Sequence, residues 1–185
     1  LGDIMGTDSV AWDCIRSVKL SGALSIQGNQ EVDFIERMEE AGIGTPGRRR
    51  AQKAAAPSTP PDASELLHWL SALPVRLKFK AFELVHASLD EPLFFQYLDS
   101  EDAAIRHFQK QARPVCFVGH THIPAVWTLN GTRIIASSLT EEPFPLKPGS
   151  KSIVNAGSVG KPRDGDSCAS YVLYNQRQRI VCRRR

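Results

Sequence analysis

Apolar residues recur every three or four positions in four segments of the chain, a pattern typical of helices with one buried face. In the first segment, Ala11, Cys14, Ile15 and Val18 share that face. We therefore predict helices over these residues, over 32–40, from Asp62 or Ser64 to Leu73, and over 100–111, with Ser100 as the N-cap of the last.

Short runs rich in β-branched and aromatic residues lie between and after these helices. They predict strands at 23–26, 75–79, 82–85, 115–118, 125–129, 132–136, 152–154, 169–174 and 179–182. Asn130-Gly131 separates two of them and is a strong signal for a two-residue hairpin. Helices alternate with strands early and strands dominate late, so we expect an α/β fold with a mixed sheet or two packed sheets and helices outside.

The segment 43–63 differs from its surroundings. It is rich in Gly, Pro, Ser and Ala, and it contains three successive arginines at 48–50 and Pro60-Pro61. This composition is typical of a loop. A length of 185 residues suits one domain, so we expect a single domain over 1–185 with a flexible loop at 43–63.

The overall charge argues against a polyanion partner. The chain has 23 Lys and Arg against 20 Asp and Glu, a net charge of +3, and 42% hydrophobic residues are enough for a real core. Arginine clusters at 48–50 and 183–185 are expected in a solvated loop and tail. A nucleic-acid binder acting through Arg48–Arg50 would show a steep salt dependence, but a basic face is missing from the sequence, so we expect no nucleic-acid partner.

The four cysteines, Cys14, Cys116, Cys168 and Cys182, are far apart and form no Cys-x-x-Cys pair. We expect free thiols in a reducing compartment rather than disulfides or a zinc cluster. The sequence also lacks a run of the roughly 20 apolar residues that a membrane helix needs. Together these features predict a cytoplasmic protein without a membrane partner.

Five polar residues stand beside the early predicted elements. Asp3 lies near the start, Asn29 follows 23–26, His86 follows 82–85, and His120 and His122 follow 115–118. Ligands of open α/β sheets collect beyond the carboxyl ends of the strands, so these side chains could converge. Their oxygen and nitrogen atoms suit Mn, Fe, Zn or Ni. Two such ions about 3.5 to 4 Å apart can hold a phosphate and activate water.

Each of these residues also has a purely structural interpretation. Asp3 suits a turn or a helix start, Asn29 suits a helix cap, and His86 suits a hydrogen-bonded place in the core. However, a glycine precedes Asp3, Asn29 and His120, and it would let the backbone turn sharply and aim the next side chain at an ion. The ordered set therefore predicts binding of at least one metal ion.

Three further groups are expected to be structural. His68 and His107 lie in predicted helices and are expected at the surface. Glu31 lies near a helix start, where the macrodipole favours an acid, and needs no catalytic role. The three tryptophans are expected in the core or at its edge.

Five segments, taken in order, resemble the motifs of the calcineurin-like metallophosphoesterases. They are Gly2-Asp3-Ile4-Met5-Gly6, Gly28-Asn29-Gln30-Glu31, Val85-His86-Ala87-Ser88, Gly119-His120-Thr121-His122, and the run from Asn155 to Asp166. The closest likeness is to the small bacterial branch of symmetrical dinucleoside-tetraphosphatase and phosphodiesterase-like enzymes. The resemblance covers the chain except about 43–61. It implies two mixed β-sheets packed face to face with flanking helices, a four-layer α/β/β/α sandwich.

The resemblance also implies a dinuclear metal site of divalent ions such as Mn, Fe, Zn or Ni. Asp3 would be the bridging carboxylate, Asn29, His86 and His120 would complete one metal position, and His122 would belong to the other. The substrate would be a phosphorylated small molecule or a nucleotide. The glycine-rich turn at 157–160 would pack under the site, with Arg163 and Asp164 bracing that loop.

Two departures from the family pattern bear on activity. The family carries an Asp-x-His motif upstream of Gly-Asp, and this sequence holds no residues there, so we expect the first strand of the fold to be missing. The catalytic His of the family is Gln30 here. An amide can hydrogen-bond a phosphoryl oxygen but cannot donate a proton as an imidazolium can. Loss of general-acid help costs about 10² to 10⁴ in rate.

The sequence thus predicts a metal-dependent phosphoesterase with weak or absent turnover in this chain. It would hydrolyse a phosphomonoester, a phosphodiester or a nucleotide phosphoanhydride with metal-activated water. The alternative is a catalytically inactive metallophosphoesterase-fold scaffold or binding protein, for which Gln30 and the missing Asp-x-His motif argue.

Overall fold

The computed structural model describes residues 1–6, 10–43 and 59–185, which form two compact units. The helical unit comprises Gly2–Pro74, and the sheet unit comprises Leu1 and Val75–Arg185. Most of the segment 43–63, expected as a loop, lies outside the described residues.

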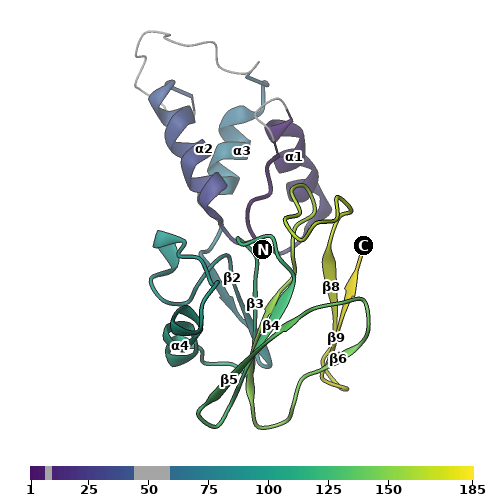
Figure 1. Ribbon diagram of the computed structural model, residues 1–185. Helices are drawn as coiled ribbons and strands as arrows, with labels where there is room; N and C mark the ends of the chain where they lie inside the picture. The colour runs from purple at the N-terminus through teal and green to yellow at the C-terminus, as the bar shows by residue number, and fades with distance from the viewer. Residues whose placement is uncertain (7–9, 44–58) are drawn as a thin grey trace. The chain divides into compact units, whose positions relative to one another are not determined.

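The helical unit contains α1 (Ala11–Ser21), α2 (Asn29–Glu40) and α3 (Ala63–Ser71). Within the unit, α3 lies between α1 and α2 (Figure 1). The apolar faces predicted from the sequence meet in one core, where the rings of Trp12 and Phe34 pack edge to face at 5.0 Å. The three predicted helices are therefore confirmed, although α2 begins at Asn29, three residues before the predicted start.

The strand predicted for 23–26 is wrong. These residues form neither helix nor strand in the structure; Leu24 is 71% exposed, whereas Ile26 is fully buried. The backbone N–H of the next residue, Gln27, donates to the carbonyl of Pro74 at 3.0 Å. A strand needs a hydrogen-bonded neighbour, and a local apolar run does not tell whether one is present.

The sheet unit is built on a large mixed sheet. Its order is β1-β2-β3-β7-β4-β5, and β2, β3 and β7 run parallel while the other neighbours are antiparallel. The carboxyl ends of the three parallel strands therefore share one edge of the sheet. The strands are β1 (Arg76–Lys78), β2 (Phe82–Val85), β3 (Val115–Val118), β4 (Ala125–Asn130), β5 (Arg133–Ser138) and β7 (Lys151–Asn155).

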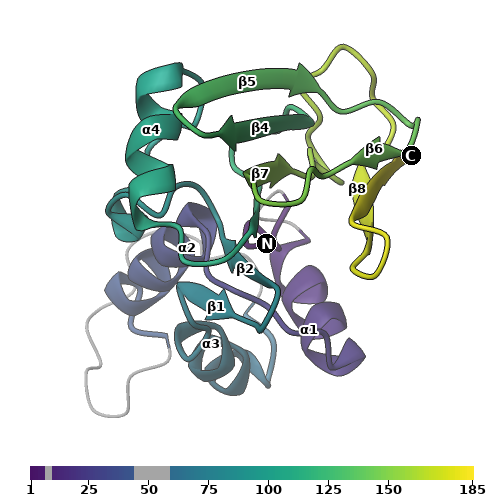
Figure 2. The ribbon, with the colours of Figure 1, turned by 90° about the horizontal axis from the view of Figure 1, so that it is seen from below.

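A small sheet and one helix cover the two faces of the large sheet. The small sheet has the order β6 (Phe144–Pro145), β9 (Ile180–Arg184) and β8 (Tyr171–Asn175), and the helix is α4 (Glu101–Lys110). Cys116 and Val118 of β3 pack in one cluster with Phe108 of α4, and Val115 and Phe117 of β3 pack in another with the small sheet. Figure 2 shows α4 and the small sheet on opposite sides of the large one.

The predicted α/β class with two packed sheets is thus confirmed. The small sheet is wholly antiparallel rather than mixed, because β8 and β9 are joined by a short turn at 176–179. The two-residue strand β6 was not predicted, because so short a run carries no period. A short 3₁₀ turn at Pro92–Phe94 precedes α4.

The N-cap of α4 and the hairpin between β4 and β5 both follow from local sequence signals. The hydroxyl of Ser100 accepts a hydrogen bond from the N–H of Ala103 at 3.3 Å, which confirms the predicted N-cap of α4. The hairpin between β4 and β5 is also confirmed, but Asn130 pairs with Arg133, so the loop is one residue later than predicted. Gly131 takes the left-handed conformation there, with φ of 62°.

The structure shows the state of the cysteines and the length of the helices. All four cysteines are free; Cys116 is buried and Cys168 is exposed. Across the described ranges, every helix is too short or too polar to traverse a bilayer.

Candidate metal centre

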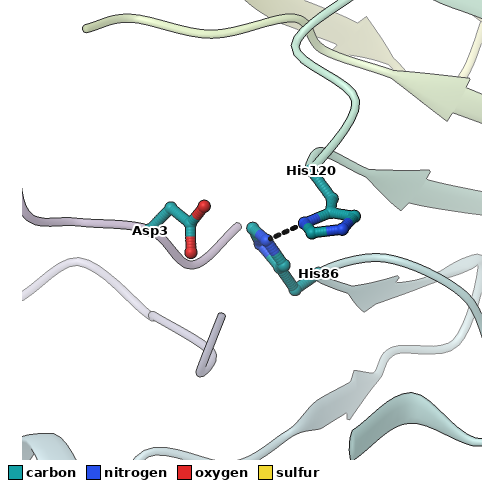
Figure 3. Close-up of side chains that lie close together, drawn as sticks. All are labelled: Asp3, His86 and His120. Carbon is teal, nitrogen blue, oxygen red and sulfur yellow. Dashed lines mark hydrogen bonds between the residues drawn. The ribbon is translucent and has the colours of Figure 1, made fainter. Parts of the chain in front are cut away.

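His86 and His120 come together at the carboxyl ends of two neighbouring parallel strands. His86 directly follows β2, and His120 follows β3 after Gly119. The Nε2 atom of His86 lies 3.2 Å from the Nδ1 atom of His120 (Figure 3). Both residues are buried, with 2% and 9% exposure. Two ring nitrogens at this separation are suited to share one divalent ion.

The backbone of the sheet unit orients the His86 ring. Its Nδ1 atom donates to the carbonyl oxygen of Leu1 at 2.6 Å. A carbonyl only accepts, so Nδ1 is the donor in this bond, and Nε2 is the ring nitrogen that faces His120. In metalloproteins a ligating histidine almost always donates its second N–H to such an acceptor. His86 thus makes the kind of Nδ1 hydrogen bond that orients a metal ligand.

Two aromatic side chains pack on the histidine pair. The ring of Tyr97 lies 4.3 Å from that of His120, centroid to centroid, and the ring of Phe95 stands edge-on to His86 at 5.8 Å. Both come from the segment between the 3₁₀ turn and α4. These contacts restrict the rotation of the two imidazoles.

Asn155 anchors the loop that carries His120 and His122. It ends β7, and its Nδ2 donates to the carbonyl of Gly119 at 2.6 Å and to the hydroxyl of Thr121 at 2.9 Å. Its Oδ1 accepts from the N–H of Gly157 at 2.9 Å. The sequence assigned this residue no role. The sequence signal that could have identified Asn155 is its position at the end of a strand, which it shares with His86.

Three candidate ligands have a left-handed backbone. The φ angles of Asp3, His120 and His122 are 53°, 61° and 62°. This conformation is uncommon outside glycine and clusters at functional sites. A sharp backbone turn was expected at the glycine before each ligand, and the structure has it at only some of these glycines. Gly2 is left-handed with φ of 81°, whereas Gly28 is extended with φ of −111°.

His122 is buried, with 7% exposure, and its backbone carbonyl accepts from the N–H of Arg163 at 3.2 Å. Among the described residues, the ring nitrogens close enough to share an ion include those of His86 and His120 but not those of His122. The structure therefore brings together two of the three predicted histidines.

Asp3, Asn29 and Gln30 belong to the helical unit, including the Asp3 side chain drawn in Figure 3. The carboxylate of Asp3 accepts from the backbone N–H of Gln30 at 3.1 Å and from its side-chain amide at 3.3 Å. Asn29 is the first residue of α2 rather than its cap, which is Gly28. The Oδ1 atom of Asn29 is buried and has no hydrogen-bond partner among the described residues. A buried oxygen left in this way can be satisfied by a cation.

Glu31 is more than the helix-start acid that the sequence suggested. It is fully buried, and its carboxylate accepts from the backbone N–H groups of Gly28, Asp3 and Ile4 at 2.6, 2.7 and 2.7 Å. Burial raises the pKa of Glu31, while the three N–H donors act to lower it. The signal for this role was its place directly after Asn29 and Gln30 in one motif.

The prediction of a surface position for His107 is wrong, while His68 is exposed as predicted. His107 lies on the buried face of α4, and its Nδ1 accepts from the N–H of Leu89 at 3.2 Å. Burial lowers its pKa to about 3, so the ring is neutral. The segment after His86 is thereby tied to α4.

The glycine-rich turn at 157–160 is held by close contacts. A Cβ atom at Gly157 would lie 2.7 Å from the hydroxyl of Ser170. Asp164 accepts from Arg183 of β9 and, at 3.0 Å, from Arg185, while the bracing of the turn by Arg163 and Asp164 stays a prediction. Burial alone would raise the pKa of Asp164, but the hydrogen bond and charge of Arg183 outweigh it and lower this pKa.

A pocket of about 520 Å³ runs along α2 in the helical unit, and Gln30 is one of the residues that line it. Its other lining residues are mostly acidic or apolar: Met5, Gly6, Asp33, Phe34, Glu36, Arg37 and Glu40.

No family model matches the chain. The chain is 28% identical over 191 residues to the "uncharacterized protein MJ0912" of Methanocaldococcus jannaschii, covering 96% of this chain and 70% of that protein. It is also similar to the crystal structure of a metallophosphoesterase from Sphaerobacter thermophilus, with a TM-score of 0.76 and 27% identity. That similarity covers 100% of this chain and 75% of the other.

Proposed function

Because the chain has the fold of the calcineurin-like metallophosphoesterases, we propose that it is a metal-dependent phosphoesterase. Its substrate would be a phosphorylated small molecule or a nucleotide with a phosphomonoester, phosphodiester or phosphoanhydride bond. The observation that carries the proposal is the His86–His120 pair, with ring nitrogens 3.2 Å apart at the ends of parallel strands.

The donor chemistry fits a divalent ion. The Nε2 atom of His86 lies beside Nδ1 of His120, while its Nδ1 bonds to the carbonyl of Leu1, and Asn29 has a buried oxygen without a hydrogen-bond partner in the described part of the chain. Imidazole nitrogens with amide and carboxylate oxygens suit Mn, Fe, Zn or Ni. We assign the ligands as Asp3, Asn29, His86, His120 and His122, for two divalent ions. For the residues outside the histidine pair, the assignment rests on the motif resemblance.

A bound ion would supply Lewis-acid stabilisation of the phosphoryl oxygens and activation of a water molecule. The protein would contribute orientation, since His86 and His120 are buried and packed by Phe95 and Tyr97. Gln30 would donate a hydrogen bond to a phosphoryl oxygen but could not protonate the leaving group. We therefore expect slow turnover.

One observation favours the second candidate, a catalytically inactive scaffold or binding protein. The side-chain amide of Gln30 already donates to the Asp3 carboxylate at 3.3 Å. At the position where the family carries its catalytic histidine, this chain thus has a group engaged with a proposed ligand. For either function we propose the cytoplasm, where the four free thiols would stay reduced.

Metal stoichiometry tests the site directly. The purified protein, loaded with Mn²⁺ and measured by plasma emission, is expected to retain at least one ion. Asp3→Ala and His120→Ala are expected to lose most of it, because each removes a donor atom. His68→Ala removes an exposed histidine on α3 and is expected to leave the metal content unchanged. A wild type without bound metal would overturn the proposal.

Hydrolysis of bis(p-nitrophenyl) phosphate with Mn²⁺ then separates the two candidate functions. Slow turnover that disappears in His120→Ala supports the esterase. Metal binding without any turnover supports the scaffold.

A further inference from the structure

Glu31 joins two turns that are distant in the sequence. Its Oε2 atom accepts from the N–H groups of Asp3 at 2.7 Å and Gly28 at 2.6 Å, and its Oε1 atom accepts from the N–H of Ile4 at 2.7 Å. Asp3 and Ile4 lie 28 and 27 residues from Glu31. One fully buried carboxylate therefore holds both the turn that carries Asp3 and the turn that precedes Asn29.

The chemistry of this contact requires a carboxylate. Three donors face two oxygens, and an ionised carboxylate is an acceptor at every lone pair. A glutamine would place an NH₂ group against at least one backbone N–H, so two donors would face each other. Hydrogen bonds to an ionised acceptor are also about twice as strong as neutral ones. Asp3 needs this support, because its φ of 53° is unfavourable for a residue with a side chain.

We propose that Glu31 is a positioning residue, which fixes the backbone of Asp3 and Asn29 in the geometry that binds the metal. It would touch neither ion nor substrate and would act through those two ligands. The inference rests on the proposed function, since it assigns Asp3 and Asn29 to the metal.

Glu83 in the sheet unit provides a matched control. It is also fully buried, and its carboxylate accepts from the N–H groups of Ala112 at 2.8 Å and Arg113 at 3.0 Å. Arg76 donates to it as well, at 2.9 Å through Nε. Glu83→Gln therefore also removes a carboxylate oxygen that accepts from backbone N–H groups. At Glu83, however, these N–H groups belong to residues that are not proposed metal ligands.

The experiment compares Glu31→Gln, Glu31→Asp and Glu83→Gln with the wild type by calorimetric titration with Mn²⁺. Loss of a residue that orients metal ligands typically costs 10- to 100-fold in affinity. We expect a loss of that size in Glu31→Gln and a smaller loss in Glu31→Asp, which keeps both oxygens. Glu83→Gln is expected to lower the melting temperature without changing the Mn²⁺ affinity. Amide hydrogen exchange of Asp3, Ile4 and Gly28 in the metal-free protein is expected to accelerate in Glu31→Gln only.

The outcomes are distinct. Wild-type Mn²⁺ affinity in a folded Glu31→Gln, or an equal loss of affinity in Glu83→Gln, overturns the positioning role but leaves the phosphoesterase proposal intact. If Glu31→Gln does not fold, the Mn²⁺ affinity of Glu31→Asp is the test. A wild-type Mn²⁺ affinity in Glu31→Asp then overturns the positioning role. Absence of Mn²⁺ binding in the wild type overturns the proposed function, and this inference with it.

Discussion

Gln30 lies at the position where the motif resemblance implies a catalytic histidine. Its backbone N–H and its side-chain amide both donate to the Asp3 carboxylate, at 3.1 and 3.3 Å. The position is therefore close to a proposed ligand, but the amide has no proton that it can transfer at neutral pH. A histidine here could act as a general acid.

Gln30→His is accordingly expected to raise the turnover of bis(p-nitrophenyl) phosphate with Mn²⁺ by about 10²-fold, the lower end of what a general acid contributes. Steady-state kcat is the measurement. Gln178→His, in the turn between β8 and β9, is the control and is expected to have no effect. An unchanged kcat in Gln30→His would mean that this residue does not limit turnover.

At the scale of an element, the turn after β7 depends on one glycine. Gly157 has φ of 80°, and an added Cβ would lie 2.7 Å from the hydroxyl of Ser170 and 2.8 Å from a ring carbon of Pro124. Its N–H donates to Asn155, the residue that anchors the Gly119 loop. Strain at this glycine would therefore reach the loop that carries His120.

Gly157→Ala is expected to lower the free energy of unfolding by more than about 1 kcal/mol, because the left-handed conformation alone costs about that much in alanine. Urea unfolding measures it. Gly160→Ala lies in the same turn with open space around its Cβ and is expected to change stability by less than about 0.5 kcal/mol. Equal effects of the two substitutions would contradict the steric account.

At the scale of the whole molecule, the buried neutral His107 links stability to pH. Its pKa in the folded protein is lowered from 6.5 to about 3, first by burial and then by the charge of Arg76. Between these values the unfolded chain binds a proton that the folded chain does not. The free energy of unfolding therefore falls as the pH drops below 6.5.

We expect this contribution to reduce the free energy of unfolding by about 1 kcal/mol for each pH unit below that point. Urea unfolding at pH 7 and pH 5.5 checks it against His107→Gln, which removes the titrating group. His68→Gln, at an exposed histidine, is expected to keep the wild-type slope. A wild-type slope in His107→Gln would show that His107 does not carry the effect.

Much of the fold follows from patterns within short segments. The strand predicted at 115–118 coincides with β3, and the predicted cap at Ser100 is present. Both depend on neighbours in the sequence, through side-chain alternation and one local hydrogen bond. The failure at 23–26 has the opposite origin, since strand pairing depends on a partner that a local pattern does not contain.

The sequence by itself determined the α/β class and the identity of the candidate ligands, because periodicity and motifs are properties of adjacent residues. Only the tertiary structure decided which side chains meet. The His86–His120 pair exists because β2 and β3 pair in parallel, and the three hydrogen bonds to Glu31 exist because distant turns converge on one carboxylate. Contacts of this kind are set by packing across the whole chain, and the burial of His107 is set in the same way.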